Sequence, residues 1–304
     1  MQGKHGKLQS AMEYLMTYGW AVLLIGVILG ALFELGLFNP TSFSAKATPG
    51  SCSIYRPNGP GTTQFIKKQG ICNNEIPQYV AVKKGSSGAA VSSYISVAPS
   101  TSNISKIQNA VTVSAWVNID PSFLSNVYNY VFSNSRDCCG FYNGFDLYVA
   151  TGNPVFDIWN TNKYAYTSSV KLSSNTWYML AGTFDGSLIK VYINGNYIGS
   201  AAYSGSIGVP SSYGSYLGAM GAGPTAYEFG GKLSNVQVYD TSLSANEIKS
   251  LYVAGIGAAP IDIQHIMGWW PLNGNANDYS GNNYDGVPNG ISYTSNWESG
   301  YNIP

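Results

Sequence analysis

The 304-residue chain carries 15 Lys and Arg against 15 Asp and Glu, and only 10% of its residues are charged, compared with about 25% in typical soluble domains. Binding to nucleic acid needs a surface rich in Lys and Arg, so this composition excludes that class of function. Hydrophobic residues make up 45% of the chain, with 24 Tyr, 11 Phe and 7 Trp, which excludes a disordered chain and suffices for a sizeable core.

A long uncharged segment lies near the N-terminus. Residues 14–33 contain no charged side chain, and this length is enough for a helix to cross a bilayer. Lys4 and Lys7 precede it, which places the short leader in the cytoplasm and the rest of the chain outside by the positive-inside rule. Residues 35–50 lack the small-residue cleavage site of a secretory signal. We therefore expect a hydrophobic transmembrane helix over residues 9–39 that the mature protein keeps.

The start of this helix carries a specific motif. Residues 9–21 read QSAMEYLMTYGWA and resemble the N-terminus of archaeal type IV pilin-like proteins with class III signal peptides. The resemblance implies that a prepilin peptidase removes residues 1–8 by cutting between Leu8 and Gln9, and that the helix then packs with other pilin subunits in a filament core. Leu8 departs from the family pattern, in which Gly or Ala is more usual, so a cut after Gly6 is an alternative.

Glu13 lies at the mouth of the apolar helix. A carboxylate at this depth is costly unless it has a partner, and the resemblance implies that the partner is the freed α-amino group of a neighbouring subunit. The alternative is a plain N-terminal membrane anchor with Glu13 at the level of the lipid headgroups. The expected location is the cell membrane before assembly and an extracellular filament at the cell surface afterwards.

Four cysteines in an exported chain indicate two disulfides. Cys52 and Cys72 bracket a loop rich in Pro, Gly and Lys, and a disulfide between them would staple a stalk over residues 40–77. Cys138 and Cys139 are adjacent, so a bridge between them would form a strained, tight turn. Pairing of these two with Cys52 and Cys72 is the alternative connectivity.

The remaining residues, 78–304, change from helical to alternating periodicity. Along residues 110–119, Val, Ala and Ile alternate with other side chains, which is typical of a half-buried strand. Asn194 and Gly195 predict a two-residue hairpin between apolar runs, and a capping-box pattern at residues 244–247 predicts a short helix. Further strands are expected around residues 90–97, 130–133, 145–150, 155–160, 177–184, 188–193, 196–202, 215–219 and 232–239.

Four segments of this part have a recognisable order: VTVSAWV (111–117), NTWYMLAGTFDG (175–186), KVYING (190–195) and FGGKLSNVQVYDTSLSANEI (229–248). They resemble the concanavalin A-like, laminin-G-like jelly roll over about residues 78–255. The resemblance implies a mainly β fold in which two antiparallel sheets form a sandwich. It also implies recognition of carbohydrate or protein ligands, in some relatives with calcium.

The C-terminal part contains a segment that is out of place. Residues 268–283, GWWPLNGNANDYSGNN, resemble the opening of such a domain, but too few residues follow to build a second one. We therefore expect residues 266–295 to supply strands that the N-terminal side of the head lacks, so that the sandwich is circularly permuted. A remnant of a tandem array is the alternative.

Candidate binding residues are aromatic. An aromatic ring can stack on the C–H face of a sugar while neighbouring Asn and Asp bind its hydroxyl groups. Trp116, Tyr142, Tyr148, Trp159 and Tyr164 are the candidates for such a platform, and each of them also suits the core or an ordinary sheet surface.

Other candidate sites are less specific. Asp278, Asn282 and Asp285 offer oxygen ligands for calcium, the only cofactor considered, and would equally suit an Asx-rich turn. Asn103 begins the sequon Asn-Ile-Ser and is a candidate glycan site.

An enzyme is not predicted. Glycosidases of this jelly-roll type need two carboxylates that face one cleft, which we looked for roughly two to four residues apart on one strand, and no two Asp or Glu of this chain lie that close. His265 is the only histidine outside the leader, so it cannot build a zinc site with other histidines.

The sequence thus predicts a pilin-like filament subunit with a lectin-like head for adhesion or glycan recognition. Its expected partners are other pilin subunits, the prepilin peptidase, the membrane and glycans. The alternatives are a membrane-anchored lectin-like protein and a filament subunit whose head is purely structural.

Overall fold

The computed structural model describes residues 18–29, 52–57, 63–68, 76–83, 93–126, 128–135, 143–160, 163–166, 170–210, 214–221 and 227–304. Backbone contacts divide the chain into two units, Met1–Lys46 and Ala47–Pro304. We describe each unit by itself.

In the first unit, residues 18–29 form a helix. Its large apolar side chains are between 48% exposed, at Ile28, and 70% exposed, at Trp20. Among the described residues, no helix combines the length and apolarity needed to cross a membrane. Leu8, Gln9 and Glu13 lie outside the described residues, so the processing site and the pairing of Glu13 stay predictions.

The predicted stalk contains a small hairpin. Strand β1 (Cys52–Pro57) pairs antiparallel with β2 (Thr63–Lys68), and Cys52 lies opposite Lys68 at the open end of the hairpin. The other three cysteines, Cys72, Cys138 and Cys139, lie outside the described residues, and the disulfides stay predictions.

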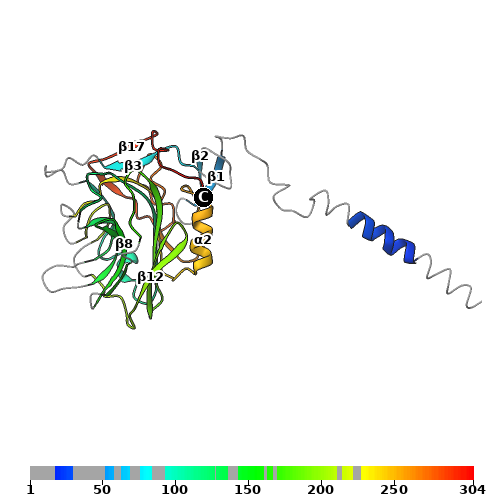
Figure 1. Ribbon diagram of the computed structural model, residues 1–304, viewed down its shortest axis with the longest axis horizontal. Coiled ribbons are helices and arrows are strands. Elements are labelled where there is room, and N and C mark those ends of the chain that lie inside the picture. The colour runs from blue at the N-terminus through cyan, green and yellow to red at the C-terminus, as the bar shows by residue number, and fades with distance from the viewer. Residues whose placement is uncertain are drawn as a thin grey trace, which may run out of the picture. The chain divides into compact units, whose positions relative to one another are not determined.

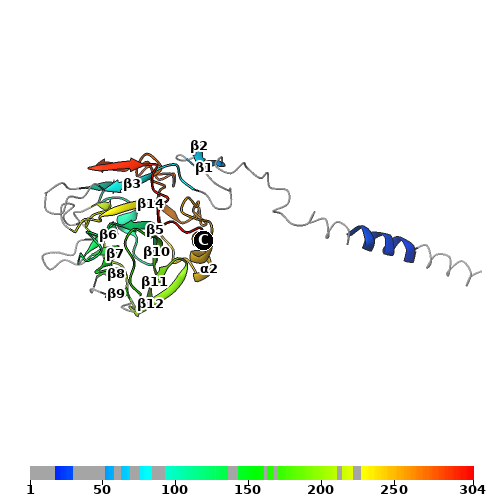
Figure 2. The ribbon, with the colours of Figure 1, turned by 45° about the horizontal axis from the view of Figure 1, so that its top comes forward.

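The rest of the second unit is a sandwich of two antiparallel sheets (Figures 1 and 2). The eight-stranded sheet contains, in chain order, β3 (Val80–Lys83), β5 (Val111–Ile119), β10 (Trp177–Phe184), β11 (Leu188–Ile193), β12 (Asn196–Ala202), β14 (Gly231–Tyr239), β15 (Ile266–Trp270) and β17 (Ile291–Thr294). The seven-stranded sheet contains β4 (Tyr94–Ala98), β6 (Asn129–Ser133), β7 (Gly144–Ala150), β8 (Asn153–Trp159), β9 (Lys163–Tyr166), β13 (Ser215–Leu217) and β16 (Val287–Asn289).

The C-terminal strands belong to both sheets. In the eight-stranded sheet, β14 pairs along one edge with β5 and along the other with β3 at its start and β15 at its end. β17 extends that sheet by pairing with β3, and β16 extends the seven-stranded sheet by pairing with β4. The last part of the chain therefore completes both sheets, while circular permutation relative to other domains stays a prediction.

The segment that begins the head is held by this C-terminal part. The indole Nε1 of Trp297 donates a hydrogen bond to the carbonyl of Pro77 over 3.1 Å. The side-chain oxygen of Asn273 accepts one from the backbone N–H of Tyr79 over 2.8 Å. Both partners lie about two hundred residues further along the chain.

The main core lies between the sheets and is built from alternate residues of the strands. Val111, Val113, Ala115, Val117 and Ile119 of β5 all point into it. The other face of β5 is also covered, because every residue of the strand is buried. The expectation of a half-buried strand is therefore wrong: β5 lies in the middle of its sheet, and both of its faces pack against other elements.

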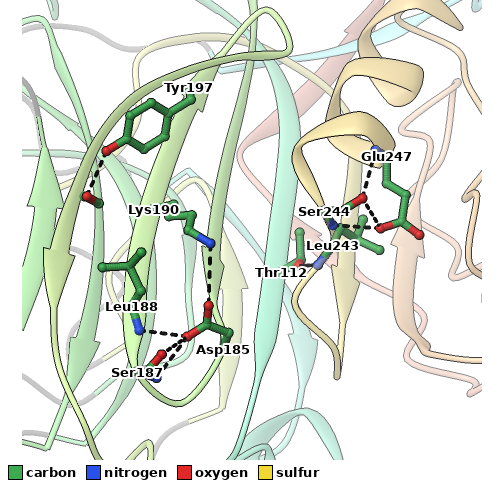
Figure 3. Close-up of polar contacts among 10 residues, drawn as sticks. Thr112, Asp185, Ser187, Leu188, Lys190, Tyr197, Leu243, Ser244 and Glu247 are labelled. Atoms are coloured by element: carbon green, nitrogen blue, oxygen red, sulfur yellow. Dashed lines mark hydrogen bonds and ion pairs between the residues drawn. The ribbon is translucent and has the colours of Figure 1, made fainter.

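Helix α2 (Ala245–Val253) covers the outer side of the eight-stranded sheet (Figure 1). Its capping box is present: Ser244 Oγ accepts a hydrogen bond from the N–H of Glu247, and the Glu247 carboxylate accepts one from the N–H of Ser244 (Figure 3). Just before the helix, Thr112 Oγ1 of β5 accepts a hydrogen bond from the N–H of Leu243 over 2.9 Å. The predicted helix is confirmed, and this contact fixes where it begins.

Two turns of the eight-stranded sheet follow from local chemistry. Between β10 and β11, Asp185 Oδ1 accepts hydrogen bonds from the N–H groups of Ser187 and Leu188 (Figure 3). Between β11 and β12, Asn194 and Gly195 have φ angles of 51° and 74°, as a two-residue hairpin turn requires. The predicted hairpin is confirmed.

Candidate functional site

The two outer faces of the sandwich differ in what covers them. On the eight-stranded sheet, Trp116, Trp177, Met179 and Tyr192 pack under α2 and the C-terminal part of the chain in a second hydrophobic cluster. No described helix covers the outer face of the seven-stranded sheet, but β6 and most of β7 and β8 are buried on both faces, so its accessible side chains lie at the ends of the face. We call that surface the tyrosine face, after the residues that form it: Tyr94, Ser96, Tyr128, Tyr130, Ser133, Asp146, Tyr148, Asp157, Trp159, Tyr216 and Tyr227.

Strand register places the middle of the tyrosine face. Tyr216 of β13 lies opposite Ser133 of β6, and Ser133 lies opposite Asp146 of β7. Asp146 in turn lies opposite Asp157 of β8. Directly opposed residues share a face of the sheet, so four neighbouring strands present these side chains in one row.

One end of the face carries a tyrosine pair. The rings of Tyr94 and Tyr216 meet edge to face, with centroids 5.7 Å apart, and both residues are partly exposed. The amide nitrogen of Asn289 lies 3.5 Å from the hydroxyl of Tyr94, and Ser96 lies opposite Tyr216. This end therefore combines aromatic rings with hydroxyl and amide groups.

The other end carries a second pair inside a larger aromatic cluster. The ring of Tyr128 lies 5.0 Å from that of Tyr227 and 6.1 Å from that of Tyr130. Tyr130 stacks on Tyr148 at 5.0 Å. Tyr130 and Tyr148 are buried, whereas Tyr227 is 50% exposed, so solvent reaches the second pair at its rim.

Two buried carboxylates lie opposite each other on adjacent strands, Asp146 on β7 and Asp157 on β8. Asp146 and Asp157 are both 0% exposed. Asp146 Oδ2 accepts hydrogen bonds from the indole Nε1 of Trp159 over 2.8 Å and from the hydroxyl of Ser135. Burial raises the pKa of the Tyr148 phenol far above its usual range, and the nearby charges of Asp157 and Asp146 raise it further. The Tyr148 phenol therefore stays protonated on this face.

This carboxylate pair was missed by the search along single strands. The β7–β8 hairpin brings together two residues that are eleven positions apart, as the register shows. A signal was available in the sequence, because a turn at residues 151–152 between alternating runs predicts which residues face each other. Neither carboxylate is exposed to solvent, so a dissolved substrate does not reach them in this arrangement.

A charged pair lies near the second tyrosine pair. Lys83 and Glu228 form an ion pair in which the side chains are only 5% and 16% exposed, and the Lys83 ammonium lies 5.4 Å from the ring centre of Phe123. Desolvation lowers the pKa of Lys83, against the opposing effect of Glu228. The backbones of Glu228 and Tyr130 also pair in an isolated parallel β-bridge.

The structure does not bring the five predicted aromatic residues together on one surface. Tyr148 and Trp159 lie on the tyrosine face but are only 7% and 8% exposed. The prediction for Trp116 is wrong: it is 2% exposed and lies on the eight-stranded sheet. The side chains of Tyr142 and Tyr164 lie outside the described part of the structure.

Trp116 is buried because aromatic rings from later parts of the chain pack against it. Its ring stacks on Tyr252 of α2 at 5.8 Å and meets Tyr301 at 5.5 Å. The sequence analysis missed the accessible tyrosines of the other sheet, Tyr94, Tyr128, Tyr216 and Tyr227. For Tyr94, the alternation with the buried Ile95 in the same strand was a usable signal.

The predicted calcium ligands form a hydrogen-bonded turn. The carboxylate of Asp278 is 3% exposed, and its two oxygens accept four hydrogen bonds. Asn282 donates its amide to the carbonyls of Ile266 and Met267, and Asp285 accepts the N–H of Asp278 over 2.8 Å. The described residues contain no group of three His, Cys, Asp or Glu suited to a metal. The arrangement is the Asx-rich turn, and calcium at Asp278 stays a prediction that would require displacing these donors.

Two further residues lie at the surface. Asn103 is exposed at the start of the short 3-10 helix η2 (Ile104–Lys106), and its side chain makes no capping hydrogen bond. Glycosylation there stays a prediction. His265 Nδ1 lies 2.7 Å from Asp262 Oδ2 on the surface, apart from the tyrosine face.

The sandwich, with its two antiparallel sheets and the covering helix α2, agrees with the match of residues 88–249 to the model of one protein family. The chain belongs to the concanavalin A-like lectin/glucanases superfamily. The predicted mainly β, jelly-roll fold is thereby confirmed. The match ends before β15, so the three C-terminal strands of this concanavalin A-like head lie outside it.

Solved structures show a general likeness to the concanavalin A-like head. A Bacteroides ovatus protein described as carbohydrate-binding shares 18% identity at a TM-score of 0.47, over 71% of this chain and 57% of its own length. A heptameric pentraxin from Limulus polyphemus shares 17% identity at a TM-score of 0.45, over 71% of this chain and 94% of its own length. The CBM40 of a Ruminococcus gnavus sialidase, bound to sialyllactose, shares 20% identity at a TM-score of 0.44, over 55% of this chain and 97% of its own length. These likenesses are too remote to assign a ligand to this chain, and no curated protein matches its sequence.

Proposed function

We propose that this chain is a pilin-like subunit of an archaeal surface filament whose concanavalin A-like head binds glycans with the tyrosine face. The observation that carries the glycan part is the accessibility of Tyr94, Tyr216 and Tyr227 on the one outer face that no described helix covers. The filament part is supported by the N-terminal motif and by the apolar helix.

The helix supports assembly through what it exposes. Over residues 18–29 the large apolar side chains are all exposed and no polar stripe divides them. A helix that is apolar on all sides needs lipid or other helices around it. Gly19 and Gly26 lie seven positions apart with open space around them, so another helix can approach closely there. Both a membrane and a filament core provide such surroundings.

The head supports glycan binding through its chemistry. Aromatic rings give flat apolar contact with sugar rings, and hydroxyl and amide groups bind sugar hydroxyls. Tyr94, Tyr216, Ser96 and Asn289 bring these groups together at one end of the tyrosine face. Membership of a superfamily that includes lectins agrees with this use of the sheet.

The filament part predicts a specific N-terminus. We expect chains in filaments sheared from native cells to begin at Gln9, because cleavage after Leu8 frees the amine that would pair with Glu13 of a neighbour. Mass spectrometry of the N-terminal peptide measures this directly. Chains that keep Met1 and occur only in the membrane fraction would instead identify a membrane-anchored lectin-like protein.

The glycan part predicts the effect of one substitution. We expect Tyr216→Ala to weaken binding of the full chain, in detergent micelles, to its best polysaccharide about tenfold, because one stacked ring contributes roughly 1 to 1.5 kcal/mol. Titration calorimetry over a panel of polysaccharides, with and without calcium, measures the affinity.

Tyr197→Ala is the matched control for this substitution. Tyr197 is 55% exposed and lies on β12 of the other sheet, where its hydroxyl donates a hydrogen bond to Ser200 over 2.8 Å (Figure 3) and its ring meets that of Tyr192 at 6.0 Å. Equal losses in the two variants would place the binding site elsewhere. Absence of binding to every polysaccharide would favour the head that only packs against neighbouring subunits.

A further inference from the structure

We infer that one end of the tyrosine face binds a single neutral sugar residue that carries a methyl group. We call this end the Ser96 site, and it consists of Tyr94, Ser96, Tyr216, Val287 and Asn289. The inference rests on the proposed glycan binding and names the class of sugar. The next strand along the sheet, β6, is buried throughout, so the ligand is confined to this end.

Strand pairing places Ser96 in the centre of the site. On β4, Ser96 lies opposite Tyr216 of β13 on one side and opposite Val287 of β16 on the other. Directly opposed residues share a face of the sheet, so these three side chains form one row. Tyr94 lies two residues before Ser96 and shares that face. Ile95 between them packs in the core, so the row faces outward.

The sizes of the side chains leave space above Ser96. Serine is the smallest side chain of the site and lies between a tyrosine and a valine. Neighbouring strands are about 4.8 Å apart, so the backbones of Tyr216 and Val287 are on the order of 10 Å apart. Carbon atoms in contact lie about 3.5 to 4 Å apart. Two such contacts account for most of the distance, so one sugar ring fits between the two side chains.

The site is open to solvent. Val287 is 69% exposed, Asn289 is exposed, and Tyr94, Ser96 and Tyr216 are partly exposed. The rings of Tyr94 and Tyr216 contact each other edge to face at 5.7 Å, which restricts their movement before a ligand arrives. Contacts that are ordered in advance reduce the entropy lost on binding. A dissolved sugar can therefore reach a site that is already arranged.

Val287 determines the class of sugar. It is the aliphatic side chain of the site, and such a side chain gains free energy by covering apolar atoms rather than hydroxyl groups. The sugar hydroxyls can instead bond to the hydroxyl of Ser96 and to the amide of Asn289, whose nitrogen lies 3.5 Å from the Tyr94 hydroxyl. The group that suits Val287 is a methyl, as in an acetamido group or a 6-deoxy sugar.

The charges around the site favour a neutral sugar. The Ser96 site contains no Lys, Arg or His, and the exposed Asp285 lies two residues before Val287. A carboxylate loses water on binding and needs a cation to offset that loss. An acidic sugar would find no such cation among the residues of this site, and Asp285 would repel it.

Matched monosaccharides test the methyl group. The probes are glucose, 6-deoxyglucose and N-acetylglucosamine, with the corresponding galactose series, each titrated against the full chain in micelles by saturation-transfer difference NMR. We expect a methyl-bearing sugar to bind about fourfold more tightly than its parent hexose, because its methyl group is taken out of water. The sugar that shows the gain distinguishes an acetamido methyl from a ring methyl. Equal binding of all six sugars, or binding of none by a chain that binds a polysaccharide, would overturn the inference and leave the proposed function intact.

Val287→Thr tests the residue. Threonine keeps the shape of valine and replaces one methyl with a hydroxyl, so this variant should lose most of the preference and keep its affinity for the parent hexose within about twofold. Val253→Thr is the matched control, because Val253 is 51% exposed on α2 and the preference should be unchanged. A Val287→Thr chain that kept the preference would contradict the role of Val287.

Ser96→Leu tests the location. Leucine would fill the space between Tyr216 and Val287, so we expect sugar affinity to fall about tenfold or more. The unfolding temperature of the same sample shows whether the sheet still folds, and Ser96→Thr, which adds one methyl, is the milder variant. Unchanged binding by a folded Ser96→Leu chain would place the sugar elsewhere and overturn the inference. A full chain that bound no polysaccharide would overturn the proposed function as well.

Discussion

Deletion of residues 264–304 is expected to abolish the cooperative unfolding of the head. The deleted part contains β15, β16 and β17, so β14, β3 and β4 each lose a paired strand. It also contains Trp269, Trp270 and Trp297, each at most 1% exposed. Truncating one such side chain costs about 3 to 5 kcal/mol, and a whole domain is stable by only about 5 to 15 kcal/mol. Near-ultraviolet circular dichroism during heating measures the transition.

A shorter deletion is the control for this experiment. Residues 302–304 lie beyond the last packed side chain, Tyr301, and are mostly exposed. Their removal should leave the unfolding temperature within a degree or two of the full chain. If the long deletion melted like the short one, the C-terminal segment would be an appendage and the alternative of a tandem remnant would be correct.

Replacing Asp278 with Ala is expected to lower the free energy of unfolding by about 3 to 5 kcal/mol. Its Oδ1 accepts the N–H groups of Trp269 and Ser280, each over 2.9 Å. Its Oδ2 accepts the Ser280 hydroxyl over 2.8 Å and the N–H of Tyr284 over 3.0 Å. Alanine leaves these buried donors without an acceptor, and each unsatisfied buried donor lowers the free energy of unfolding. Urea unfolding followed by tryptophan fluorescence measures the loss.

Asp285→Ala is the matched control, because it removes a carboxylate from the same turn. Asp285 is exposed and accepts only the N–H of Asp278 among the described contacts, so about 1 kcal/mol is expected. Asp278→Asn should fall between the two, since it keeps one acceptor oxygen. A small effect of Asp278→Ala that grew when calcium was present would instead indicate that the carboxylate binds the ion.

Local patterns in the sequence predicted local elements well. The Ser244 to Glu247 spacing and the Asn194-Gly195 pair each specify a structure within a few residues, and both are confirmed. The strand at residues 111–119 was also predicted, but its surroundings were not. Whether Trp116 faces solvent depends on Tyr252 and Tyr301, which lie far along the chain, and alternation within one strand carries no information about them.

The candidate site was harder to predict for the same reason. Tyr216 belongs to a three-residue strand that has too few positions to show a period. Its place beside Tyr94 follows from the register of β13 with β4, a pairing of residues more than a hundred positions apart. Asp146 and Asp157 became neighbours through a hairpin, whereas the search for paired carboxylates considered one strand at a time.

The hydrogen bonds that join the C-terminal part to Pro77 and Tyr79 affect how the head can fold while the chain is being synthesised. A polypeptide is made from its N-terminus, so residues 76–83 emerge long before Asn273 and Trp297, to which they bond. Until those last residues arrive, β3 has neither its partner β17 nor its hydrogen-bonded anchor. The junction between stalk and head thus closes late, and a chain interrupted before residue 273 leaves the first strand of its head without these partners.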